Sequence, residues 1–461
     1  MQRALWLDGL RGIAAAGVTF VHAWNYDDHS PVFGFLFRSY WSDPPEDNHY
    51  FIQLPPFRLL FDGSAMVALF MVISGFAISI SILKARNGDL TGSGNFLRRV
   101  ASASTRRLFR IYFPVMMVAI ISHILFFCNA YQSWAPEWHH LWGLKPLTAP
   151  WLHIKYLSWY LLHLLDVFNH GIDINTFNHT GKKMVLNNQF WTIPIEYRGS
   201  CIVYLLLATT VFWRPQPRRA TFVLVAAYWF WVGQWDIFAF VAGLWICEGH
   251  VVPEKIESDG EIALPCDSPP PKPQRRISSA WKKAIKWKHL PRVRTAICFL
   301  VGMYFLCMPD DEPLGAEYQF LRAYFHSPNW HEKEMERRCW ISLGAVLMVY
   351  SIRHSRYLQA PLNTRPVQYL GRISFPLYLI HMVIYLILQR PLKHVFWFLV
   401  RHEWYPGKVE ASKDKLPFAV AWSGSLVVMA LIMLPLSDVW ERVVDRRCLE
   451  AGKKFERWVV G

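Results

Sequence analysis

The sequence predicts an all-α polytopic membrane protein, built as a bundle of about ten transmembrane helices with one further interfacial or re-entrant helix. Three observations predict it. Apolar residues fill 53% of the 461 positions and charged residues only 18%, whereas about a quarter of the residues of a soluble domain are charged. The apolar residues gather in blocks long enough to cross a bilayer. The chain also has 23 Trp and 31 Phe, as expected where aromatic side chains lie at membrane interfaces.

Ten of these apolar blocks are candidate spans. The first is interpreted as a retained helix, because Asp8 and Arg11 interrupt it in a way that a cleavable signal peptide tolerates poorly. No repeat indicates a second domain, so residues 1–461 are expected to form one transmembrane domain. The expected spans are 4–23, 59–83, 110–128, 191–212, 219–233, 236–250, 294–309, 338–353, 367–389 and 417–436.

An eleventh apolar stretch, residues 151–168, is also long enough to cross. Cytosolic loops are rich in Lys and Arg, and loop 84–110 carries seven basic residues against one acid. If 151–168 stays at the interface, the basic segments 214–219 and 251–293 also face the cytosol, and if it spans, they face the other side. We therefore predict that 151–168 is interfacial or re-entrant and that both termini are cytosolic. Loop 390–416, with six basic residues and three acids, is the exception to this rule.

The segment 251–293 is the one clear insertion. Its LPCDSPPPKPQRR stretch is typical of a flexible linker, since its prolines cannot sustain a helix. The following SSAWKKAIKWKHL favours a short amphipathic helix on the cytosolic leaflet. On the opposite side of the membrane, Asn178 begins an Asn-His-Thr sequon and is a candidate glycosylation acceptor.

Several function classes find no support in the sequence. The net charge of +15 comes from short loops between apolar blocks, which membrane topology and anionic lipids explain better than nucleic acid does. The eight cysteines form no CxxC pair and no metal-ligand spacing, so neither a disulfide framework nor a metal site is expected. GxSxG, HExxH and P-loop motifs, which mark hydrolases, zinc proteases and ATPases, do not occur.

The first expected span carries three ionisable residues: Asp8, Arg11 and His22. Charge within a span is costly, so such residues are functional candidates. Eleven residues separate Arg11 from His22, which places them about 20° apart around the helix and about 16 Å apart along it. Asp8 can pair with Arg11 three residues later. The alternative is a purely structural role, in which Asp8 and Arg11 form an ion pair at the membrane boundary and His22 is an interfacial histidine.

A second intramembrane acid, Glu196, starts from the same side of the membrane as His22. We expect this carboxylate to orient the imidazole and to fix its tautomer. A histidine suits removal of a proton from a hydroxyl, and an arginine suits a phosphate or carbonyl oxygen. The sequence therefore favours acyl transfer to an alcohol. The alternative is a proton-coupled transporter in which Asp8, Arg11, His22 and Glu196 form a relay.

Five segments resemble, in order, the motifs of the membrane acyltransferase-3 family. The opening LDGLRGIAAAGVTFVHAW is similar to the family's signature of an Arg, ten residues and a His. Ser74 belongs to a segment similar to the Ser-Gly-Phe motif of the second span. All five segments are LDGLRGIAAAGVTFVHAW (7–24), FMVISGFAIS (70–79), RRLFRIYFP (106–114), FWTIPIEYRGS (190–200) and LGRISFPLYLIHM (370–382).

The resemblance implies a ten-helix enzyme that O-acylates, commonly O-acetylates, a hydroxyl with acyl-CoA as co-substrate and with no bound cofactor. It implies that His22 is the catalytic base and Arg11 its partner. Arg106, Arg107 and Arg110 match the basic segment thought to face the donor. The inserted loop and the sequon are typical of a fungal-type member in the endoplasmic reticulum or another endomembrane, for which a secondary metabolite, a lipid alcohol or a glycan is an acceptor.

Overall fold

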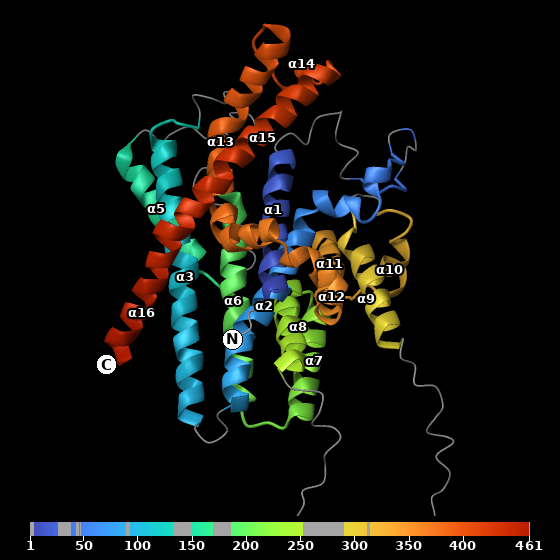
Figure 1. Cartoon of the computed structure of the whole chain (residues 1–461), viewed down its shortest axis with the longest axis vertical. Helices are drawn as coiled ribbons and strands as arrows, with labels where there is room; N and C mark the ends of the chain where they lie inside the picture. Colours follow the sequence, from blue (N-terminus) through green and yellow to red (C-terminus); the bar gives the residue numbers. More distant parts are fainter. Residues whose placement is uncertain are drawn as a thin grey trace, which may run out of the picture.

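The structure is a computed structural model in which helices form all the regular elements of the described residues (Figure 1). The expected all-α class is therefore confirmed for this part of the chain. Asn178 and most of the 251–293 insertion lie outside the described residues, so their expected roles stay predictions. The structure describes residues 4–25, 38–42, 46, 48–88, 93–131, 149–168, 186–251, 290–310 and 314–460.

Each of the ten expected spans coincides with a helix. Length and apolar composition qualify four helical segments as membrane spans within the described residues, namely 63–87, 96–127, 365–401 and 415–459. The protein is thus an integral membrane protein. The ten helices are α1 (Leu5–Asn25), α2 (Gly63–Gly88), α3 (Ser93–Phe127), α6 (Thr192–Thr209), α7 (Pro215–Val232), α8 (Trp235–Val251), α9 (Leu290–Leu306), α11 (Lys333–His354), α13 (Arg365–Arg401) and α15 (Lys415–Trp440).

Shorter elements connect or follow these helices. The stretch 151–168 contains α5 (Pro150–Leu164), which packs against α3. A π-helical turn, Glu441–Asp445, joins α15 to the C-terminal helix α16 (Arg446–Val460). The remaining elements are α10 (Gln319–Tyr324), α12 (Arg356–Gln359), α14 (Lys408–Ala411) and the 3-10 helices Phe51–Gln53, Phe57–Phe61, Asn188–Trp191 and Pro361–Asn363.

Ion pairs show which helix ends lie together. Arg86 at the end of α2 and Arg218 at the start of α7 both bind Glu248 at the end of α8. At the other end of the bundle, Asp62 beside the start of α2 lies 2.6 Å from Arg337 in α11. Successive long helices therefore run in opposite directions. Figure 1 agrees with this, because α3 ends and α6 begins at the same end of the bundle, with α5 between them. The interfacial or re-entrant position expected for 151–168 stays a prediction.

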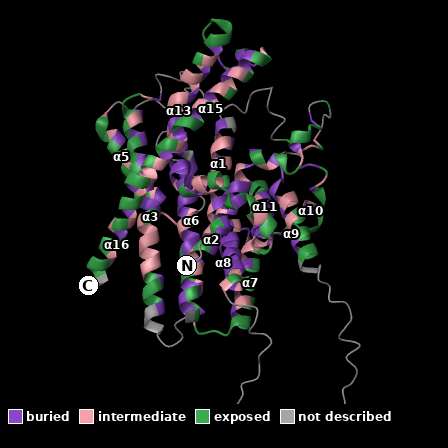
Figure 2. Cartoon of the chain, in the orientation of Figure 1, coloured by how far each residue is buried: buried purple, intermediate pink, exposed green. Residues whose placement is uncertain are grey.

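Glycines bring α1 and α13 into backbone contact. A Cβ at Gly12 would lie 2.3 Å from the backbone nitrogen of Gly371, and a Cβ at Gly371 would lie 2.3 Å from the backbone oxygen of Asp8. Either clash would force the helices apart. The close approach sets the charged face of α1 against the 370–382 segment. Figure 2 shows buried residues, in purple, in the middle of the bundle around α2 and α8.

Candidate active site

A cavity of about 290 Å³ lies among α1, α2, α3, α6, α13 and α16. Its size is near the lower limit for small-molecule sites, which run from about 300 to 1,000 Å³. It can therefore hold a slender chain or a phosphate group, but not a whole nucleotide cofactor. Six residues predicted from sequence line it, contributed by four separate helices: Arg11, Ser74, Arg106, Arg107, Arg110 and Glu196.

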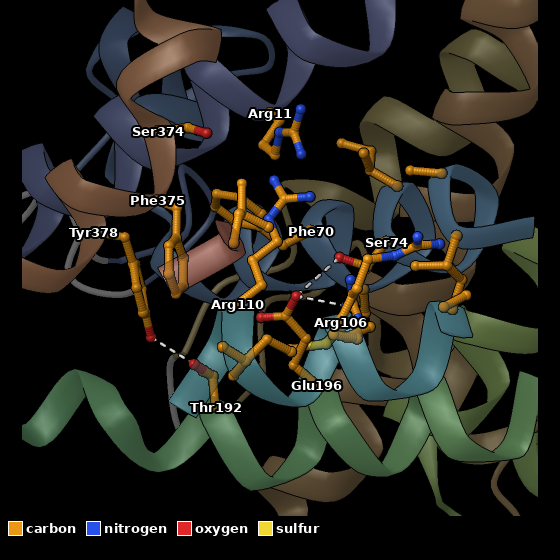
Figure 3. A pocket seen from close by; sticks show the side chains of 18 of the residues that line it. Arg11, Phe70, Ser74, Arg106, Arg110, Thr192, Glu196, Ser374, Phe375 and Tyr378 are labelled. Carbon is orange, nitrogen blue, oxygen red and sulfur yellow. Dashed lines mark hydrogen bonds and ion pairs between the residues drawn. The ribbon is translucent and has the colours of Figure 1, made fainter. Parts of the chain in front are cut away.

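Glu196 is the carboxylate of the cavity wall (Figure 3). Arg107 Nη2 lies 2.8 Å from Glu196 Oε1, and Ser74 donates to the same oxygen over 3.4 Å. Arg107 Nε also donates to Ser200, at 2.5 Å. These contacts fix the guanidinium of Arg107 by charge-assisted hydrogen bonds, which are stronger than neutral ones.

The lining carries a surplus of positive charge, with four guanidinium groups against one carboxylate. Arg110 interacts electrostatically with Arg11, Arg107, Glu196 and Asp445. The expected pairing of Arg11 with Asp8 is present in α1. Because like charges this close repel each other in a medium of low dielectric constant, the site favours a polyanionic ligand.

Aromatic side chains form a different part of the wall. Figure 3 shows Phe375 and Tyr378 on one side of the cavity and Arg106 and Ser74 on the other. The hydroxyl of Tyr378 lies 2.6 Å from Thr192 Oγ1, which joins α13 to α6. The cavity thus has a basic region and an aromatic region, as a ligand with a charged head and a slender arm requires.

His22 is not part of the cavity lining, and its imidazole contacts that of His381 in α13. The Nε2 atom of His381 lies 3.1 Å from Nδ1 of His22, with ring centroids 5.0 Å apart. Tyr378 links this pair to the cavity, since it lines the cavity and its ring centroid lies 5.9 Å from that of His381.

Backbone carbonyls set the tautomer of His381, and His381 in turn sets the tautomer of His22. His381 Nδ1 lies 2.7 Å from the oxygen of Tyr378 and 3.2 Å from that of Leu377. A carbonyl only accepts, so Nδ1 carries the hydrogen and Nε2 of a neutral His381 is an acceptor. His22 therefore donates through Nδ1, which leaves Nε2 of His22 with the lone pair that a general base needs.

The expected pairing of Glu196 with His22 is not the one that the structure has. Glu196 binds Arg107 and Ser74 instead. The sequence places Glu196 and His22 on the same side of the membrane but cannot give their lateral separation. His381 stands in the quoted segment LGRISFPLYLIHM and in an apolar run, so a histidine inside a predicted span was the signal that could have identified it.

Comparison with known proteins identifies the family. The family model described as "Acyltransferase domain", that of acyltransferase-3, matches residues 4–438. Three fungal proteins are similar over most of their length. O-acetyltransferase PaAT-1 of Phomopsis amygdali is 26% identical, covering 97% of this chain and 83% of that protein. Acyltransferase R4 of Phoma sp. is 21% identical (96% and 94%), and acyltransferase clz18 of Cochliobolus lunatus is 24% identical (86% and 86%).

No solved structure matches the chain. The family model nevertheless spans nearly all of it, which confirms the expected resemblance and favours an enzyme over the transporter alternative. Within the described residues, no group of three or more His, Cys, Asp and Glu side chains is placed to hold a metal ion. The chain belongs to the acyltransferase-3 family and is an acyltransferase family enzyme of the membrane.

Proposed function

We propose that the protein moves an acyl group, in the first instance acetyl, from acyl-CoA to a hydroxyl of a small natural product, a lipid or a glycan. The convergence of six predicted residues on one basic cavity carries the proposal. The name of the relative PaAT-1, an O-acetyltransferase, supports an oxygen acceptor. The fungal origin of the relatives supports a secondary metabolite as that acceptor.

In the reaction, Nε2 of His22 removes the proton of the acceptor hydroxyl. The oxygen attacks the thioester carbonyl, the new ester bond forms, and the carbon–sulfur bond breaks. The coenzyme A thiolate takes the proton from His22 and leaves as the thiol. His381 is a positioning residue here, because it accepts from Nδ1 of His22 and so supports the imidazolium without adding a second charge.

Arg11, in this proposal, binds the donor and not the reacting carbonyl. It lines the basic cavity beside Arg110, whereas His22 lies about 16 Å further along α1. Arg106, Arg107 and Arg110 bind the phosphates, and the pantetheine arm runs past the aromatic wall toward His22. Such a path would also keep water from the thioester.

The sidedness of the reaction follows from charge. The helix ends that carry Arg86, Arg218 and Arg353 lie together, which supports a cytosolic position for that end and for both termini. We place the protein in the endoplasmic reticulum or another endomembrane. The donor then comes from the cytosol, and the acceptor enters from the opposite side or from the bilayer.

Turnover of purified protein with acetyl-CoA and an acceptor extract, followed by release of free thiol, tests the proposal. His22→Ala should lower the rate by about 10²–10⁴-fold, the usual loss for a general base. Donor binding and melting temperature should stay near those of the wild type. His354→Ala, which changes an exposed histidine at the end of α11, is the matched control. A His22→Ala rate above a tenth of wild type would exclude His22 as the base.

The role of His381 is tested by its replacement. His381→Gln keeps an oxygen that can accept from His22, whereas His381→Phe does not. A hydrogen bond to a group that becomes charged contributes about 1.5–3 kcal/mol, so we expect His381→Phe to lower the rate about tenfold to a hundredfold. His381→Gln should retain clearly more activity at a similar melting temperature. Equal losses of rate in both variants would mean that His381 contributes by packing and not by accepting a hydrogen bond.

A further inference from the structure

The C-terminal helix α16 forms part of the cavity wall although it lies beyond the matched family domain. That match ends at residue 438, and Leu449 of α16 lines the cavity. The helix is packed against α3: a Cβ at Gly452 would lie 3.1 Å from Cβ of Phe109, and the ring of Phe455 lies 5.1 Å from that of Phe109. Thus α16 is fixed to the same helix that carries the donor arginines.

One carboxylate of α16 forms an ion pair with those arginines. Glu456 Oε2 lies 3.8 Å from Arg106 Nη1. This separation is longer than a hydrogen bond. Glu456 therefore offsets part of the charge of Arg106 without taking up its hydrogen-bond donors.

This contact is weak compared with what a phosphate offers. The side chains of Arg106 and Glu456 are 43% and 24% exposed, and pairs of this kind add little to stability because water screens them. A phosphate accepts two parallel bonds from one guanidinium. A donor phosphate can therefore replace the Glu456 carboxylate without loss of a strong contact.

We propose that Glu456 holds the place of a donor phosphate at Arg106 in the donor-free enzyme and thereby sets its affinity for acyl-CoA. This inference rests on the proposed function, because it takes the arginines as the donor site. Glu456 reduces the positive charge at Arg106 in the donor-free enzyme. Donor binding must displace this carboxylate, so its removal should strengthen binding.

The test is acetyl-CoA binding and kinetics with the full-length protein. The variant Glu456→Gln keeps the side-chain shape and removes the charge, and we expect the donor KM and Kd to fall about twofold to fivefold. Glu450→Gln is the matched control, since it removes one charge from an exposed position of the same helix, and it should leave both constants near the wild-type values. Melting temperatures confirm folding.

A second pair of changes separates the two proposals. Arg106→Lys with Arg110→Lys keeps the charge and loses the bidentate fork, so the donor KM should rise. If it does not change, the arginines are not the donor site, and both the donor path and this inference fall. If it rises while Glu456→Gln leaves KM unchanged or higher, or no lower than Glu450→Gln does, only the inference is overturned.

Discussion

Two clusters of arginine and glutamate lie among the helices, and they differ in what surrounds them. At one end of the bundle, Glu248 binds both Arg86 and Arg218, and the three side chains are 0–5% exposed. In the cavity, Glu196 binds Arg107, and these side chains are 25% and 11% exposed. The first cluster is enclosed by protein, whereas the second faces a space lined by three further arginines.

The difference teaches that a charge within a helix of the bundle is accessible to a ligand only where it faces a cavity. The Glu248 cluster fixes the ends of α2, α7 and α8 to one another. Such a fully enclosed group contributes to stability through its hydrogen bonds and leaves no room for a ligand. Arg198 and Asp236, 2.5 Å apart and buried, are a second enclosed pair of this kind.

Removal of the carboxylate at Glu248 is expected to have the larger effect on the fold. Glu248→Gln leaves two buried guanidinium groups without a counter-charge, and loss of one partner from a buried pair costs about 3–5 kcal/mol. We expect a clear fall in melting temperature and in the yield of folded protein, measured by thermal unfolding in detergent. An unchanged melting temperature would mean that the enclosed cluster does not hold these helix ends together.

Removal of the carboxylate at Glu196 should act on catalysis and much less on the fold. Glu196→Gln weakens the charge-assisted bond that positions Arg107, worth about 1.5–3 kcal/mol, so kcat/KM for acetyl-CoA should fall about tenfold to a hundredfold. The melting temperature should fall much less than in Glu248→Gln. If the two variants lose stability equally, the distinction between enclosed and cavity-facing clusters is wrong.

Most of the helices could be predicted, because the position and length of each apolar block can be seen in the sequence. The ten expected spans coincide with ten helices, although several bounds differ. The largest difference is in the third span, which was expected over residues 110–128, whereas α3 already starts at Ser93. The part of α3 before Arg110 was not predicted as helix, because its basic residues are typical of a loop. A long helix can carry such residues past the membrane boundary while its backbone stays hydrogen-bonded.

Several residues of the candidate site could be predicted, but not all of their contacts. Arg11, Ser74, Arg106, Arg107, Arg110 and Glu196 were identified from intramembrane charge and motif resemblance, and they line one cavity. His381 and α16 were missed as parts of the site. Neither carries a local signal for its contact, since His22 and His381 are 359 positions apart and Leu449 lies beyond the matched domain.

The sequence by itself determined the class of fold, the family and the ionisable residues that lie within expected membrane spans. These follow from composition, spacing and motif order, which are properties of the chain. The tertiary structure alone decided which residue contacts which: Glu196 with Arg107, His22 with His381, and α16 with α3. The physical reason is that a helix fixes the direction of a side chain around its own axis, while only the packing of helices selects the partner it faces.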